Sequence, residues 1–257
     1  MSYIAIIGQF FIGFFAASGR LSLFTFHGLS AVFVPPLYPR IILQQVMRIG
    51  YYSLPVVALT SFFTGGVLAL QIYYGGNQFN SESIVASIVA LGITRELGPV
   101  LAGLMVAGRV SAAIAAEIGT MRVTEQIDAL TTLSTDPFKY LVAPRLIAAT
   151  ICMPILAFVA DVIGIFGGYS VGTQSLGFNS AIYVQKTYNF LELGDITSGL
   201  IKAAAFGFII ALLGCYHGYN SSGGAQGVGR ATTNAVVSAS ILILAANYLM
   251  TSLLFAS

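Results

Sequence analysis

Five long apolar stretches dominate the sequence and restrict the chain to one kind of environment. They cover residues 51–74, 83–118, 146–172, 196–216 and 231–255. A helix needs about 20 mostly apolar residues to cross the hydrocarbon layer of a bilayer, and each stretch reaches that length. Charged residues make up only 8% of the 257 residues, against about 25% in a typical soluble domain. The sequence therefore predicts an all-α polytopic membrane protein with about five transmembrane helices.

The second stretch, residues 83–118, is the longest and contains charged residues. A straight helix of this length would extend roughly 50 Å, whereas the hydrocarbon layer is about 30 Å thick, so we expect a tilt, a kink or a projection. Arg95 and Glu96 fall well inside it. Charges at this depth usually face a cavity or a partner, and Pro99 should bend the helix beside them. The two residues either line a polar patch in a cavity or form local ion pairs that only hold helices together.

The N-terminal segment, residues 1–50, precedes the first span. Its apolar run has no basic region before it and no small-residue cleavage site after it, so an interfacial helix fits better than a signal peptide. From Arg40 to Arg48, polar and apolar residues recur at helical spacing, which predicts an amphipathic helix leading into the bilayer. Residues 51–257 then form the transmembrane domain.

Basic residues indicate the orientation, because they concentrate in short cytoplasmic loops. With the N-terminus in the cytoplasm, only Lys186 and Lys202 fall toward the outer side. The inner group is Arg20, Arg40, Arg48, Arg122, Lys139, Arg145 and Arg230. We therefore predict a cytoplasmic N-terminus and an external C-terminus. Small residues at four-residue spacing in several spans also favour a tight bundle and a dimer.

The densest charged stretch, residues 117–134, lies between the second and third spans. Arg122, Glu125 and Asp128 recur at every third position, and apolar residues fall on another face. This pattern predicts a short amphipathic helix on the cytoplasmic side. Such a helix rests on the membrane, docks into a groove of a partner protein or is a plain solvated loop helix.

Several kinds of site are absent from the sequence. No G-x-x-x-x-G-K-[ST] motif is present, so any ATP hydrolysis requires a partner. The glycine-rich run at 223–229 lacks a lysine and reads as a flexible cytoplasmic loop. The two histidines and two cysteines are scattered, which predicts no metal site. A net charge of +2 is too small to suggest nucleic acid as a partner.

Several segments resemble the permeases of MlaE/YrbE-type ABC transporters. The longest is AEIGTMRVTEQIDAL at residues 116–130, and the resemblance extends over nearly the whole chain from about Arg40 onward. The other matching segments are residues 61–71, 95–100, 107–109, 136–137 and 230–233.

The resemblance implies a homodimer in the bacterial inner membrane, bound to two cytoplasmic ABC ATPase subunits. It also implies a periplasmic ring of MCE-domain proteins and allows for a small cytoplasmic accessory subunit. The cargo would be a phospholipid moved between the inner and outer membranes, which maintains outer-membrane lipid asymmetry. This chain would need no cofactor, because ATP and magnesium would bind the partner ATPase.

The resemblance also implies two groups of functional residues. A lipid cavity at the dimer interface would be lined by the first two spans, with apolar walls for acyl chains and Glu96 as its charged position. The cavity candidates are Leu68, Gln71, Phe79, Arg95 and Glu96. The candidates for coupling to the ATPase are Glu117, Arg122, Glu125, Gln126 and Asp128.

Two other functions stay open on the residues alone. A proton-coupled secondary transporter would use Glu96 and Asp161 as proton carriers, with Arg95 or Lys202 as partners, although no internal repeat pairs the two halves. A membrane enzyme would need Glu96 and Asp161 to meet as paired carboxylates, and no other catalytic group supports it. In either case we expect Asp161 to face the bundle interior and to find a donor, either Lys202 or a tyrosine.

Overall fold

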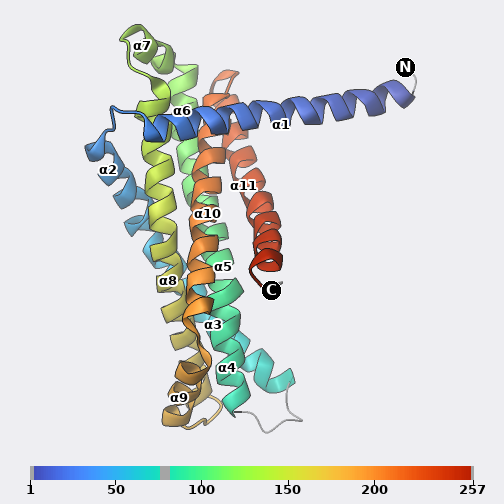
Figure 1. Cartoon of the computed structure of the whole chain (residues 1–257), viewed down its shortest axis with the longest axis vertical. Coiled ribbons are helices and arrows are strands. Elements are labelled where there is room, and N and C mark those ends of the chain that lie inside the picture. Colours follow the sequence, from blue (N-terminus) through green and yellow to red (C-terminus); the bar gives the residue numbers. More distant parts are fainter. Residues whose placement is uncertain (1–2, 76–81, 256–257) are drawn as a thin grey trace.

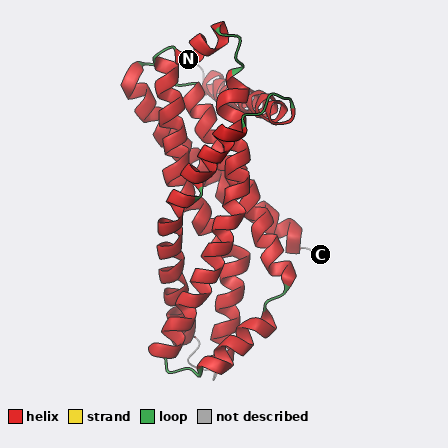
Figure 2. Ribbon diagram, turned by 90° about the vertical axis from the view of Figure 1, so that its left-hand side faces the viewer, coloured by secondary structure: helices red, strands yellow, loops and turns green. Residues whose placement is uncertain are grey.

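The chain forms an elongated helical bundle with one long helix lying across it near one end (Figure 1). The computed structural model describes residues 3–75 and 82–255, and within these ranges it contains helices, turns and short loops but no strand (Figure 2). Helices α1 (Tyr3–Phe33), α2 (Pro39–Ile49), η1 (Tyr51–Ser53) and α3 (Leu54–Gly75) come first. They are followed by α4 (Glu82–Gly92), η2 (Ile93–Leu97), α5 (Gly98–Val106), η3 (Ala107–Ser111), α6 (Ala112–Val123) and α7 (Gln126–Thr132). The last elements are η4 (Phe138–Val142), α8 (Ala143–Gln174), α9 (Ser180–Phe190), α10 (Leu193–Tyr219) and α11 (Gly224–Phe255).

Five helical segments of the described chain are long and apolar enough to cross a membrane, which confirms the predicted architecture. They are Pro39–Gly75, Ile84–Val123, Phe138–Gln174, Leu193–Tyr219 and Gly224–Leu254. The amphipathic helix predicted near Arg40 is α2, and a single 3-10 turn joins it to α3. The chain is therefore an all-α multi-pass membrane protein.

The second span stays continuous over α4, η2, α5, η3 and α6 because two π-helical turns absorb its irregularities. The first, η2, lies directly before Pro99, where the proline ring removes an N–H and would clash with the preceding turn of a regular α-helix. There the Gly98 N–H donates to the carbonyl of Ile93, five residues back. The irregularity expected at Pro99 is thus a widened turn that carries Arg95 and Glu96.

Glycines let the central helices approach until their backbones touch. A Cβ at Gly65 in α3 would collide with the carbonyl oxygen of Gly164 in α8, and one at Gly167 would collide with the carbonyl of Phe62. Helix α10 uses Gly207 in the same way against α8. In lipid, such close approach replaces the hydrophobic effect as the source of helix–helix attraction. The small residues noted in the sequence therefore form the helix interfaces within the bundle.

Helix α1 crosses the bundle near the end that also carries α7 and extends well beyond it (Figure 1). Phe24, which is buried, anchors it against the rings of Phe138, Tyr216 and Tyr219. Farther out, Ile12 and several other large apolar side chains are exposed. This arrangement agrees with a helix in the membrane interface.

Two loop predictions need correction. The glycine-rich run 223–229 is not a flexible loop, because α11 begins at Gly224 and only Gly223 and Gly224 adopt positive φ. Nor is 117–134 a single amphipathic helix. Helix α6 ends at Val123, Glu125 takes the left-handed conformation at φ 60°, and α7 starts at the next residue. A left-handed residue reverses the chain direction, which sequence periodicity does not reveal.

Candidate functional site

A network of charged and polar groups lies inside the bundle where the second span meets α10 and α11. The Nζ of Lys202 donates to Oε1 of Glu96 at 2.7 Å and to Oγ1 of Thr251 at 2.8 Å. Thr251 in turn donates to Oε1 of Glu96, and Asn247 donates to its Oε2, each at 2.8 Å. Donors from two helices, α10 and α11, therefore hold the Glu96 carboxylate of the second span in a fixed position.

The proline in the second span explains one contact of Lys202. In a regular helix the carbonyl of Arg95 would accept from residue 99, but Pro99 has no N–H. The Nζ of Lys202 donates to this carbonyl at 2.9 Å. The lysine side chain is completely buried, so each of these acceptors offsets part of the cost of removing its charge from solvent. Pro99 and Lys202 thus form one structural unit.

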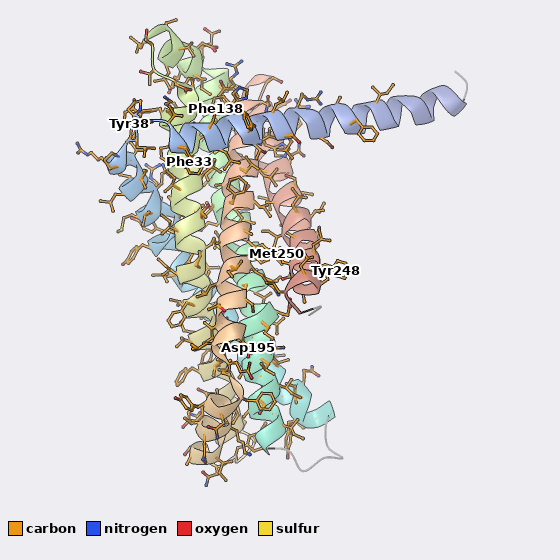
Figure 3. All side chains as sticks on the ribbon, in the orientation of Figure 1. Phe33, Tyr38, Phe138, Asp195, Tyr248 and Met250 are labelled. Atoms are coloured by element: carbon orange, nitrogen blue, oxygen red, sulfur yellow. The ribbon has the colours of Figure 1, made fainter. Side chains whose placement is uncertain are left out.

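The neighbouring Arg95 pairs with Asp195 at the start of α10. The guanidinium contacts Oδ1 of Asp195 at 2.6 Å, and the aspartate is almost completely buried. The other oxygen, Oδ2, accepts from the backbone N–H of Glu192 as part of a capping box. Figure 3 labels Asp195 on the first turns of α10, beside the second span. Asp195 therefore both caps α10 and neutralises Arg95.

The predicted residues Arg95 and Glu96 both form ion pairs with α10, and both stay partly open. The side chain of Glu96 is 36% exposed and that of Arg95 is 37% exposed, whereas their partners are buried. One face of each of the two ion pairs is therefore accessible to a ligand or to a neighbouring subunit.

Leu68 and Gln71 lie beside this region. Together with Leu97, which directly follows Glu96, they line a shallow cavity of about 330 Å³ between α3 and the second span. The cavity wall is mainly apolar, with the Gln71 amide as one of its polar groups. Leu68 and Gln71 thus share a cavity with Leu97, the chain neighbour of Glu96, whereas Arg95 and Glu96 face α10 and do not line it. Phe79 lies outside the described residues.

Asp161 faces the interior as expected, but the predicted donor is wrong. Its carboxylate is buried against Gly98, and neither oxygen has a hydrogen-bond partner among the described residues. Lys202 is engaged by Glu96 instead. A buried carboxyl without a cation costs least when it is neutral. Asp161 and Glu96 therefore occupy different environments and do not form a carboxylate pair.

The predicted coupling residues divide into two groups in the structure. Glu117 belongs to the bundle, where it pairs with Arg48 of α2 at 3.2 Å and with Arg145 of α8 at 2.9 Å. Arg122 pairs with Asp128 across the turn before α7 at 2.8 Å. Glu125 and Gln126 are exposed at the tip, while Ile127 is buried. Helix α7 thus presents a polar outer surface and packs against the bundle through Ile127 and the partly buried Leu130.

The described residues contain no group of three or more His, Cys, Asp and Glu side chains placed to hold a metal. The described part of the chain combines membrane-spanning helices, an ion-pair network within the spans and an exposed polar turn at one end.

Comparison with known proteins identifies the class. Residues 42–253 match the model of the family described as Permease MlaE. The chain is 58% identical over 250 residues to a probable ABC transporter permease of Rickettsia typhi, covering 97% of this chain and 96% of that protein. It is an ABC transporter permease subunit, and not itself an ATPase.

More distant relatives extend the comparison. The intermembrane phospholipid transport system permease protein MlaE of Haemophilus influenzae is 34% identical over 256 residues, covering 99% of this chain and 98% of that protein. The chloroplastic protein TRIGALACTOSYLDIACYLGLYCEROL 1 of Arabidopsis thaliana is 37% identical over 213 residues, which cover 83% of this chain and 61% of that protein. The chain belongs to the MlaE family of permeases. As a permease of this class, it works with an ATPase on a partner subunit.

Sequence reasoning missed three members of the network: Asp195, Asn247 and Thr251. Each lies 100 or more residues from its partner in the second span. Asp195 gave a weak signal, since it stands at the third position after Glu192 in a capping-box pattern. Asn247 and Thr251 are one helical turn apart in an apolar span, which places both on one face.

Proposed function

We propose that this chain is the permease subunit of an ABC transporter that moves phospholipids between the inner and outer membranes of a bacterium, so maintaining outer-membrane lipid asymmetry. The observation that supports this most is that Arg95 and Glu96, ion-paired to the buried Asp195 and Lys202, stay about one-third exposed, while the next residue, Leu97, lines a mainly apolar cavity. A phospholipid needs both parts: a polar position for its head group and apolar walls for its acyl chains. The printed name of the Haemophilus relative supports the same cargo.

The cargo site in this proposal combines the cavity at Leu68 and Gln71 with Arg95 and Glu96. The open face of Arg95 attracts the lipid phosphate, and the carboxylate of Glu96 accepts from amino or hydroxyl groups of the head group. The buried partners, Asp195 and Lys202, hold both charges in position.

A homodimer completes the site. Helix α11 is the least enclosed of the five spans, and Val237, Ile241, Leu244 and Tyr248 are exposed along it. Figure 3 shows Tyr248 directed away from the bundle. Because α11 also supplies Asn247 to the network, a second copy packed on it would lie beside Glu96. The lipid cavity then lies between the two subunits.

The remaining partners bind the two opposite ends of the molecule. The ATPase binds α7 on the cytoplasmic side through Arg122, Glu125, Gln126 and Asp128, and Glu117 transmits the movement into the bundle. A small accessory subunit on the same side assists it. A ring of MCE-domain proteins binds the opposite, periplasmic end. This chain then needs no cofactor of its own, because ATP and magnesium stay in the partner.

The test is purification of the tagged chain from its native membrane in mild detergent, followed by mass spectrometry of proteins and lipids. We expect a stoichiometric ATPase and bound phospholipid. Changing Glu125 and Asp128 to Lys should remove the ATPase and leave the lipid, while Glu96→Gln should reduce the lipid and leave the ATPase. Arg20→Gln, on the exposed part of α1, is the matched control.

A secondary transporter is the second candidate, since Glu96 is a partly open carboxylate within a span. It requires lipid or solute movement in vesicles that contain only this chain and a proton gradient. Movement under those conditions, without an ATPase, would overturn the proposal. Movement only with the ATPase and ATP would support it.

A further inference from the structure

A second, smaller cavity lies toward the α7 end of the molecule, between α2 and the second span. Its volume is about 180 Å³, and its polar lining consists of Gln45, Arg48, Arg109 and Glu117. Glu117 follows Glu96 in the same continuous span, and at 1.5 Å per residue the two lie roughly 30 Å apart. This cavity is therefore separate from the site around Glu96, and its role does not depend on the cargo of the transporter.

Positive charge exceeds negative charge around this cavity. Glu117 is shared between Arg48, at 3.2 Å, and Arg145, at 2.9 Å. The third guanidinium, that of Arg109, donates to the carbonyl of Arg48 at 2.6 Å and to Oγ of Ser53 at 2.8 Å, so it contacts no carboxylate. Three cations and one anion leave two positive charges uncompensated. An anionic ligand at this position would be attracted from the membrane surface.

Gln45 provides an independent observation. Its side chain is only 6% exposed and lines the cavity. Its amide makes no hydrogen bond to any other residue that the structure describes. The Gln45 amide keeps access to solvent at the cavity, and its NH₂ group is available to donate to an anion bound there. Arg48 also lines the cavity, its side chain is 61% exposed, and its guanidinium carries N–H donors beyond the one that contacts Glu117.

The surroundings favour a lipid over a free ion. Apolar residues, among them Ile49 and Ile114, line the rest of the cavity. Tyr52, which lines the cavity at η1, is 62% exposed. The cavity is large enough for a phosphate-bearing head group but not for acyl chains, which would extend past the Tyr52 ring along the outside of the bundle. Basic pockets between spans at the cytoplasmic surface bind anionic lipid head groups in this way.

We propose that this cavity binds the phosphate of an anionic phospholipid from the leaflet on the α7 side. Gln45, Arg48 and Arg109 are the donors, and Glu117 holds Arg48 in place. The bound lipid would connect α2 to the second span near Glu117, which lies six residues before Val123, the end of α6.

The first test is site-specific photo-crosslinking in the full-length protein. A small diazirine side chain at Ala113, an exposed residue of the cavity wall, should crosslink to ³²P-labelled phospholipid in membranes. Combining Gln45→Met with Arg48→Gln should lower this signal about tenfold, because charge-assisted hydrogen bonds to the phosphate are lost. Arg40→Gln, an exposed charge on the same helix, is the matched control and should leave the signal within about twofold.

A second photo-residue controls for general lipid contact. At Ile155, which is exposed on α8, crosslinking should be the same in all variants. An unchanged signal at Ala113 in the double variant would overturn the proposal. If that variant does not elute as a single species on size exclusion, Gln45→Met alone gives the same test with a smaller expected decrease.

The second test separates the sources of the anion. The full chain, reconstituted in vesicles of phosphatidylcholine with phosphatidylglycerol, should crosslink mainly to phosphatidylglycerol. Excess inorganic phosphate should not compete. Equal labelling of both lipids would contradict a preference for anionic lipid, and competition by inorganic phosphate would show a site for the free ion. Each of these results would overturn the lipid assignment.

Discussion

At the residue scale, the membrane-embedded charges are stabilised by groups that lie far away in the sequence. Lys202 is fully buried, and its ammonium contacts a carboxylate, a hydroxyl and a backbone carbonyl. The cost of burying an ion pair is offset only when its remaining donors and acceptors are also satisfied. The network therefore stabilises the bundle as a unit, and removing one member should affect the others.

The first prediction concerns the pair Glu96 and Lys202. Glu96→Leu leaves the buried ammonium of Lys202 without its carboxylate. Breaking a fully buried ion pair costs about 3–5 kcal/mol. We expect a loss of about 3 kcal/mol, because solvent reaches the carboxylate. The double variant with Lys202→Met should be more stable than Glu96→Leu alone. Thermal unfolding in detergent gives both values. Additive losses in the two single variants would show that the pair is not coupled.

The second prediction concerns the contact of Gly65 with Gly164. The Gly65→Ala methyl group would meet a backbone carbonyl, which cannot move without separating α3 from α8. We expect a loss of about 1–3 kcal/mol, measured as a lower melting temperature. Gly108→Ala is the control, because its methyl group would meet no atom within 4 Å. Equal melting temperatures for the two variants would contradict the close approach.

At the scale of elements, the interruptions of the helices carry as much information as the helices. The π turn before Pro99 directs Arg95 and Glu96 toward α10, and the left-handed Glu125 separates α7 from α6. A continuous α-helix would direct Arg95 and Glu96 elsewhere and would leave α7 in line with α6. The apolar stretches predicted the five spans and Pro99 predicted an irregularity beside it, but the sequence pattern did not show that this is a π turn, nor that a left-handed residue divides 117–134.

The third prediction uses the conformation of Glu125. Glycine adopts positive φ without strain, whereas a β-branched residue does not. Glu125→Gly should therefore keep the turn and remove only the carboxylate, and Glu125→Val should lower stability by about 1–2 kcal/mol. The amount of ATPase that co-purifies with each variant then shows whether binding depends on the backbone turn or on the Glu125 carboxylate. If both variants lose the ATPase equally, the carboxylate is the essential feature.

The fourth prediction concerns the attachment of α1. Phe24→Ala removes the ring that contacts Phe138, Tyr216 and Tyr219. Losing a buried phenylalanine costs about 3–5 kcal/mol in a rigid core, and here it should release α1 before the bundle unfolds. Hydrogen exchange should accelerate around Phe24 but not in α8. Phe26→Ala, with an exposed ring, is the control.

At the scale of the whole molecule, the two ends of the bundle differ. One end carries α7 and the attached part of α1, and the other carries α9 (Figure 1). The distribution of arginines predicts that the α7 end faces the cytoplasm. The proposed binding sides of the ATPase and of the MCE-domain ring depend on this orientation.

The fifth prediction tests that polarity. Thr131→Cys in α7 and Asn189→Cys in α9 are both exposed positions, and the two native cysteines are buried. A membrane-impermeant maleimide should label Asn189→Cys in intact spheroplasts and Thr131→Cys only in inverted vesicles. The reverse pattern would invert the orientation and move the proposed ATPase contact to the wrong side.

The sequence by itself determined the class of this protein and the identity of its most informative acid. Apolar stretches of membrane-spanning length leave the backbone no solution but helices, because lipid offers no hydrogen bonds. Arg95 and Glu96 were visible because a charge is costly inside such a stretch. Only the tertiary structure decided their partners, since Asp195, Lys202, Asn247 and Thr251 reach them through the packing of helices distant in sequence. It also decided that Asp161 stays apart, because which face of a uniformly apolar helix meets its neighbour depends on backbone contacts at glycines.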